Sequence, residues 1–208
     1  MASLRCGRSA MAAPGEHACG DRTGCWHDRH GGTWLAIIDG LGHGPLAALA
    51  ADTALAALAP AITDARAGPP QPRQLLEDLH GPLAGTRGAA IGLACVRGDQ
   101  LHHAGIGNTR AGVLRDGRLH GLPSAYGIVG APTPVRGHAM PPVGTPAFTL
   151  CAGDWLLLYS DGLPERLPLP VVPAAWRQDP LRLCEHLLAT ARQPRDDAAV
   201  IAAWVEAV

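Results

Sequence analysis

An Asp stands at the tip of four segments that are expected to be β-strands. These acids are Asp21, Asp39, Asp161 and Asp196, and Asp196 is followed directly by Asp197. Glycines flank the first three, which is typical of a strand that delivers a carboxylate beside an open turn. A single Asp-Gly pair is only a turn signal. Four such acids on separate segments instead predict a fold whose strand ends converge, and whose carboxylates form one site for hard metal ions.

Length and composition exclude several classes of protein. A chain of 208 residues fits one domain of moderate size. The formal net charge is −1 and aromatic residues make up 4%, which argues against a nucleic-acid partner. All 17 basic residues are Arg, so a phosphate-binding P-loop and a Schiff-base mechanism, both of which need Lys, are excluded.

The N-terminus and the cysteines suggest a cytoplasmic protein. Residues 1–13 contain no apolar stretch long enough for a signal peptide, and no later run is expected to cross a membrane. The six cysteines include no C-x-x-C pair, which favours reduced, buried side chains. We therefore expect a mobile extension over residues 1–13, a single domain over 14–208, no membrane partner and a cytoplasmic location.

Hydrophobic periodicity divides the chain into strands and helices. A hairpin is expected from the runs 25–28 and 33–39, joined by the turn 29–32. Apolar stripes and helix-start signals predict helices at 45–62, 73–83 and 180–192. Further strands are expected at 89–97, 100–108, 109–115, 118–122 and 198–205, and a second hairpin at 147–162 with its turn at 152–153. Residues 122–147 lack a period and are expected to be irregular, with a short strand at 135–139.

The tally of about eight strands and three helices predicts an α+β fold of packed sheets flanked by helices. The order of the motifs then suggests a family. GD, DGLGHG, GTRGAAIGLA, GIGN, YGIVG, GDWLLLYSDG and RDDAAVIAA follow one another between Pro14 and Val205. This order resembles the metal-dependent (PPM-type) serine/threonine phosphatases, in the branch of stage II sporulation protein E, and within it the small RsbX-type phosphatases of stressosome and partner-switching pathways. The resemblance implies an αββα sandwich with two central antiparallel β-sheets.

The resemblance also implies two Mn²⁺ or Mg²⁺ ions that hold a bridging hydroxide for phosphate-ester hydrolysis. By motif match, Asp39 bridges the two ions and the backbone carbonyl of Gly40 binds one of them. Asp161 and Asp196 complete the second ion's ligands, and Asp21 acts directly or through a water. Asp197 is either the true ligand in place of Asp196 or a supporting residue, and we favour Asp196.

Some positions depart from the family pattern. Gly20 stands where many larger relatives have an acid, so one outer ligand is missing. The proposed general acid of eukaryotic relatives falls at Leu41, and the nearest imidazole is His43. His43 is a candidate for protonating the leaving oxygen, but it is also compatible with a helix cap or a solvent-facing position. Arg22 and Arg87 are candidates for attracting phosphate, with a structural role as the alternative.

The function expected from these features is removal of phosphate from serine or threonine of a regulatory protein. The resemblance implies a partner with a STAS-type domain, the sulfate-transporter and anti-sigma-antagonist domain. We also expect the phosphatase to be a monomer. Two alternatives remain at this point: a non-catalytic module that retains the fold and sequesters a signalling partner, and a small-molecule phosphoesterase using the same metals. Asn108, in GIGN, is a candidate for holding a turn near the site through its side-chain amide; the turn role alone accounts for it, and it is not counted among the catalytic residues.

Overall fold

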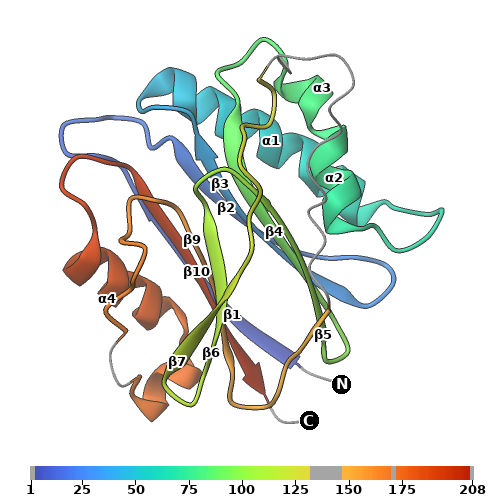
Figure 1. The fold of residues 1–208 in the computed structure, drawn as a ribbon, viewed down its shortest axis with the longest axis vertical. Coiled ribbons are helices and arrows are strands. Elements are labelled where there is room, and N and C mark those ends of the chain that lie inside the picture. The colour runs from blue at the N-terminus through green and yellow to red at the C-terminus, as the bar shows by residue number, and fades with distance from the viewer. Residues whose placement is uncertain (1–2, 132–146, 170–171, 207–208) are drawn as a thin grey trace.

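Two five-stranded antiparallel sheets form the centre of the protein (Figure 1). The computed structural model describes residues 3–131, 147–169 and 172–206. One sheet has the order β1-β10-β9-β6-β7, with bounds Ser3–Met11, Ala198–Glu206, Trp155–Tyr159, Arg110–Arg115 and Arg118–Leu122. The other has the order β2-β3-β4-β5-β8, with bounds Asp21–His27, Gly32–Gly40, Ala89–Arg97, Gln100–Ile106 and Phe148–Thr149. All neighbouring strands pair antiparallel.

The two faces of β3 show why the sheets pack as layers. Leu35 and Ile37 point into the core between the two sheets. Trp34 and Ile38, on alternate positions, point into a second core beneath the helices. Because both faces of β3 are covered, its sequence is a nearly continuous apolar run, and Asp39 is the first acid after it.

Helices cover the outer face of each sheet, which confirms the αββα sandwich. α1 (Pro45–Thr63), α2 (Pro72–Asp78) and α3 (His80–Leu83) pack on the sheet that contains β3. α4 (Leu181–Ala191) packs on the other sheet, beside the short 3₁₀ helix η1 (Ala174–Arg177) (Figure 1). The helix expected at 73–83 is two helices, because Pro82 in a continuous helix would clash with the carbonyl of Asp78.

The apolar character of α1 was underestimated from the sequence. α1 has 19 residues with a mean hydropathy of 1.6, so it is long and apolar enough to cross a membrane, contrary to the expectation that no run would be. In the structure one face of α1 packs against β2 and β3, and Ala50, Ala54 and Leu58 on that face are buried. Its hydropathy is therefore accounted for by its place over the sheet.

The expectation of a mobile extension at residues 1–13 was wrong. β1 pairs with β10 along its whole length, from Ser3 opposite Glu206 to Met11 opposite Ala198. β1 lies at the edge of its sheet and exposes many of its side chains, so its sequence lacks the apolar pattern of an inner strand. Its pairing with the last strand joins the two ends of the chain.

The hairpin expected at 147–162 was also wrong. β8 pairs with β5 in one sheet, whereas β9 pairs with β10 and β6 in the other. The chain crosses between the sheets at residues 150–154, where the Asp154 carboxylate accepts hydrogen bonds from Arg115 and from the backbone N–H of Cys151. The strand expected at 135–139, within the irregular segment 122–147, lies outside the described residues.

Candidate active site

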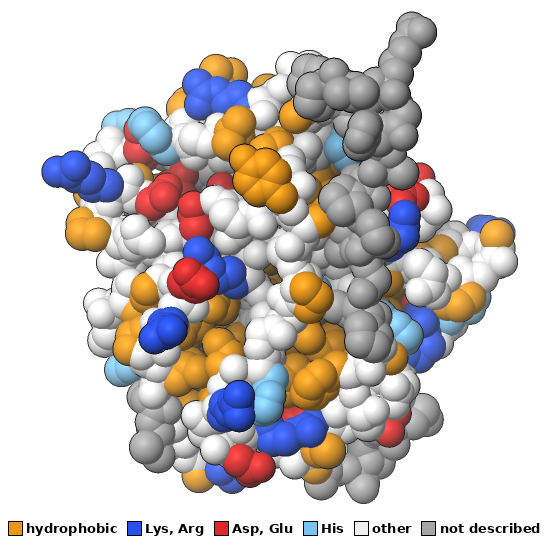
Figure 2. Space-filling view, viewed as in Figure 1, with side chains coloured by type: hydrophobic (Ala, Val, Ile, Leu, Met, Phe, Trp, Pro, Cys, Tyr) orange, Lys and Arg blue, Asp and Glu red, His pale blue; other side chains and the backbone are white. Residues whose placement is uncertain are grey.

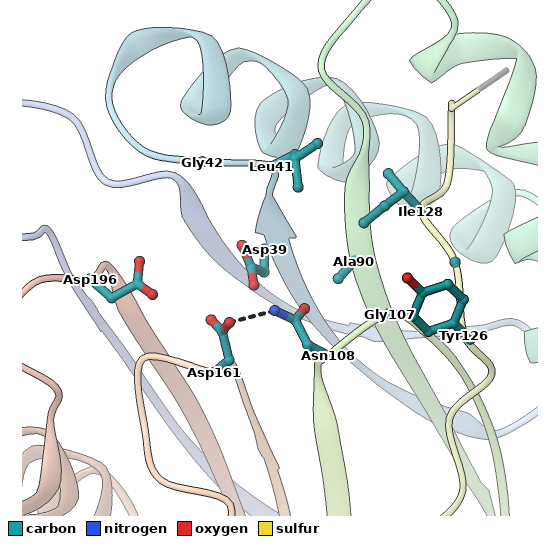
Figure 3. A pocket seen from close by; sticks show the side chains of 11 residues that line it. Asp39, Leu41, Gly42, Ala90, Gly107, Asn108, Tyr126, Ile128, Asp161 and Asp196 are labelled. Carbon is teal, nitrogen blue, oxygen red and sulfur yellow. Dashed lines mark hydrogen bonds between the residues drawn. The ribbon is translucent and has the colours of Figure 1, made fainter.

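The strand ends bring the predicted acids together at one end of the sandwich. Asp21, the first residue of β2, is the register partner of Asp39 near the end of β3. Asp161 follows β9, and Asp196 precedes β10, its antiparallel neighbour. Three of these carboxylates, from Asp39, Asp161 and Asp196, line one pocket with a volume of about 450 Å³ (Figure 3). Acidic side chains also gather at this place on the molecular surface, in the upper part of Figure 2.

Asp21 lies beneath the pocket rather than in its wall. Its side chain is 2% exposed and accepts a hydrogen bond of 2.6 Å from Ser160 Oγ. Ser160 Oγ in turn accepts a bond of 2.9 Å from the backbone N–H of Ala199. Burial, opposed by the Ser160 hydroxyl, raises the pKa of Asp21 to about 7. Asp21 is therefore held as a supporting acid under Asp39.

The carboxylates repel one another in the absence of a cation. Burial, together with the charges of Asp21 and Asp161, raises the pKa of Asp39 to about 9. Burial and the charge of Asp161 also raise the pKa of Asp196. Packing several acids in one partly buried site is unfavourable unless positive charge compensates them. The electrostatics of this cluster therefore favour bound cations.

The chemistry of the donors fits Mn²⁺ or Mg²⁺, because the pocket offers the carboxylate oxygens of Asp39, Asp161 and Asp196. Gly40, the other expected donor, ends β3 directly after Asp39 and is not among the residues that line the pocket. Within the described residues, no three His, Cys, Asp or Glu side chains are grouped closely enough to hold a metal ion as they stand.

Asp197 has a different environment from Asp196. Its two carboxylate oxygens accept hydrogen bonds of 2.7 Å from the backbone N–H groups of Ala13 and Gly20. The side chain is 2% exposed and is not part of the pocket wall. Asp197 therefore fastens the segment between β1 and β2 to the start of β10, and Asp196 is the member of the pair that faces the pocket.

Close packing, rather than an open turn, explains the glycines beside the acids. A Cβ on Gly40 would lie 2.1 Å from the carbonyl oxygen of Ala47, and one on Gly162 would lie 1.9 Å from the carbonyl oxygen of Asp197. A Cβ on Gly20 would lie 2.8 Å from both the Ala47 Cβ and an Asp197 carboxylate oxygen. This site therefore has no room for the acid that many larger relatives carry at the position of Gly20.

His43 lies outside the pocket. Its Nδ1 is 2.7 Å from the Glu16 carboxylate, and its side chain is 64% exposed. It does not cap α1, because the N-cap residue is Gly44 and no side-chain capping bond is formed. The structure therefore brings His43 to the edge of the acidic cluster and not among the lining residues.

Arg22 has a structural environment. Its guanidinium pairs with the Asp52 carboxylate at 2.6 and 3.0 Å and donates to the backbone carbonyls of Cys19 and Asp21. These bonds fix the start of β2 to α1 and so support Asp21. These contacts favour the structural role of Arg22 over attraction of phosphate.

Asn108 is part of the site, although the sequence suggested only that it holds a turn. Its Nδ2 donates a hydrogen bond to the Asp161 carboxylate across the pocket (Figure 3). Gln193 Nε2 also donates to the backbone carbonyl of Asp161, at 2.7 Å. The GIGN motif pointed to this position, but only the antiparallel pairing of β6 with β9, in which Arg110 is opposite Tyr159, shows that Asn108 faces Asp161.

The raised pKa of Asp39 predicts how pH changes the stability of the metal-free protein. An Asp in an unfolded chain has a pKa of about 3.9. Between that pH and about 9, folded Asp39 holds a proton that the unfolded chain has released. The free energy of unfolding should therefore decrease as pH rises through this window, by up to about 1.4 kcal/mol per pH unit. Urea unfolding in chelator at pH 5, 7 and 9 measures this slope.

Asp39→Asn is the matched control for this pH dependence, because its amide does not titrate. Its stability should decrease less steeply with pH than that of the wild type, because the proton held by Asp39 is absent from the variant. Equal slopes for the two proteins would contradict a raised pKa at Asp39.

Comparisons with known proteins identify the family and the fold. The family model described as stage II sporulation protein E (SpoIIE) matches residues 29–206. Similar solved structures include one from work on the bacterial stressosome as a modular system for secondary messenger signalling, with 27% identity, a TM-score of 0.77 and coverage of 97% of this chain and 99% of that one. RsbX in complex with magnesium has 17% identity, a TM-score of 0.71 and coverage of 99% and 100%.

A third structure, the catalytic domain of the serine/threonine phosphatase PstP with two manganese ions, has 20% identity, a TM-score of 0.68 and full coverage of both chains. A search of curated protein sequences finds no significant match. The fold is therefore that of the PPM-type serine/threonine phosphatases. The chain belongs to the SpoIIE family.

Proposed function

We propose that this protein is a metal-dependent phosphatase that removes phosphate from serine or threonine of a regulatory protein. The observation that carries the proposal is the convergence of Asp39, Asp161 and Asp196 on one pocket, with Asp21 beneath them, in a fold shared with PPM-type phosphatases. A non-catalytic relative would not need four acids whose charges oppose one another.

In this proposal each residue of the site has a distinct role. Asp39 and the Gly40 carbonyl, with Asp161 and Asp196, would hold two Mn²⁺ or Mg²⁺ ions. When bound, these ions supply a nucleophile at neutral pH and neutralise the charge of the phosphoryl group. Asn108 orients Asp161 through its hydrogen bond, and Ser160 holds Asp21 under Asp39. We assign no step to His43, because it is paired with Glu16 outside the pocket.

The proposed substrate is a phosphorylated STAS-type domain in a partner-switching pathway. Support for this choice comes from the similarity to RsbX and to the structure from work on the bacterial stressosome. We place recognition of the partner on the surface around the pocket, because the phosphorylated residue has to reach the acids there.

Phosphate release from a phosphorylated STAS-type domain tests the proposal, with Mn²⁺, Mg²⁺ or chelator and with an aryl phosphate in parallel. We expect release with either ion and none in chelator. Release from the aryl phosphate alone would favour a small-molecule phosphoesterase. Binding of the phosphorylated domain by a folded protein without release under any metal would favour a sequestering module.

A further inference from the structure

The wall of the pocket that faces away from the acids is apolar and exposed. Leu41, Tyr126 and Ile128 line it, and we call these three side chains the apolar rim. Tyr126 is 99% exposed and Leu41 is 49% exposed, which places both among the most exposed large apolar residues of the described chain. Figure 3 shows the carboxylates on one side of the pocket and Tyr126 and Ile128 on the other, with Asn108 between them.

Tyr126 is carried by a loop that is fastened at both ends. On one side, Ala125 accepts a hydrogen bond of 2.8 Å from Gly107 N–H and donates one of 2.8 Å to the Gly105 carbonyl. On the other side, Val129 and Ala89 exchange two backbone bonds of 3.0 and 2.9 Å. Only three residues, 126–128, lie between these anchors. The fully exposed position of Tyr126 is therefore a built feature of the pocket.

Gly88 lies next to both Leu41 and Ile128, the other two members of the apolar rim. Its carbonyl accepts a hydrogen bond of 3.0 Å from Leu41 N–H. A Cβ at Gly88, whose φ is 79°, would lie 2.6 Å from the Ile128 side chain. Leu41 and Ile128, from distant parts of the sequence, are thus held against the same residue at the start of β4. The backbone positions of Leu41 and Ile128 are therefore fixed relative to each other by the start of β4.

The Arg87 guanidinium stands next to this rim. The Arg87 side chain is exposed, and its Nη1 lies 2.9 Å from the position of a Cβ on Gly42, a residue that lines the pocket. Among the residues that the structure describes, none forms a hydrogen bond or an ion pair with Arg87. A guanidinium beside a pocket complements the charge of a phosphoryl group.

We infer that the apolar rim and Arg87 select a phosphorylated polypeptide segment in which an apolar side chain is adjacent to the phosphorylated residue. This inference rests on the proposed function. The phosphoryl group lies against the acidic wall and its metals, within reach of Arg87, while the neighbouring apolar side chain covers Tyr126 and Leu41. A pocket of about 450 Å³ has more room than a phosphoryl group needs. Covering preformed apolar surface favours binding in proportion to the area removed from water.

Two phosphoserine peptides of equal length and charge test the inference, one with leucine and one with glycine on both sides of the phosphoserine. We expect wild-type kcat/KM to be about tenfold higher for the leucine peptide. Tyr126→Ala and Leu41→Ala should each reduce this preference to about twofold or less. Arg87→Gln should lower kcat/KM about tenfold for both peptides and keep the preference, because it contacts the shared phosphoryl group.

Leu49→Ala is the matched control for Leu41→Ala. Leu49 lies on α1 outside the pocket wall and is 54% exposed, close to the exposure of Leu41. Its substitution should retain the preference for leucine. Equal kcat/KM of the wild type for the two peptides, or equal loss of preference in Leu49→Ala, would overturn the role of the apolar rim.

The failure of this inference differs from the failure of the proposed function. If an aryl phosphate is hydrolysed with Mn²⁺ and neither peptide is, the metal chemistry stands and a polypeptide segment is the wrong occupant. If no phosphate ester is hydrolysed with any metal, the proposed function is wrong and the inference is overturned with it.

Discussion

Asp39→Asn should reduce metal-dependent phosphate release about 10³-fold, which corresponds to about 4 kcal/mol of lost transition-state stabilisation. Asp39 is the register partner of Asp21, and the charges of Asp21 and Asp161 both act on it. The amide keeps the size of the side chain but removes the charge that the proposal places between the two ions. The measurement is kcat/KM with Mn²⁺ on a phosphorylated STAS-type domain, or on an aryl phosphate if that is the better substrate.

The same substitution should not damage the fold. In chelator at pH 9, Asp39→Asn should be more stable than the wild type, because it removes one of several repelling carboxylates. It should also gain less stability from Mn²⁺ than the wild type does. Asp116→Asn is a matched control at an exposed turn, and should retain full activity. Near-normal turnover by a natively folded Asp39→Asn would refute the assignment of Asp39.

Local patterns predicted most of the elements but fewer of their partners. The strand at 33–39 and the helix at 45–62 were readable because each has a strong apolar period. β1 was missed because an edge strand needs no such period, and its stability comes from pairing with β10, almost two hundred residues away. β8 and β9 were joined into a hairpin because their sequence separation is short, although they belong to different sheets.

Part of the site was also predictable from the sequence. Asp39, Asp161 and Asp196 were expected to converge and do line one pocket, because strand ends of the two sheets meet there. The sequence alone could not separate Asp196 from Asp197, since adjacent residues face opposite sides and nothing local shows which side holds the site. Asn108 was missed because its contact with Asp161 depends on the pairing of β6 with β9, two strands that are far apart in the sequence.

Substitution of Asp197 by Ala should destabilise the protein by about 3 kcal/mol or more, because a hydrogen bond to a charged group contributes about 1.5–3 kcal/mol. Two such bonds, from Ala13 and Gly20, would be lost. Both donors lie in buried residues, so their N–H groups would be left without an acceptor. Urea unfolding in chelator at pH 7 measures the loss of stability without any contribution from bound metal.

Asp196→Ala is the matched partner of this experiment, because it removes the adjacent acid that faces the pocket. It should change the metal-free stability by less than about 1 kcal/mol, since removing a partly exposed acid leaves few bonds unmade. It should, however, raise the Mn²⁺ concentration needed for half-maximal activity and for half-maximal stabilisation by about 10- to 100-fold. If the two variants exchange these properties, so that Asp197→Ala is as stable as the wild type but loses its response to Mn²⁺, then Asp197 is the metal ligand and Asp196 is not. Measurements on the two variants thus determine which of the two adjacent carboxylates is the metal ligand.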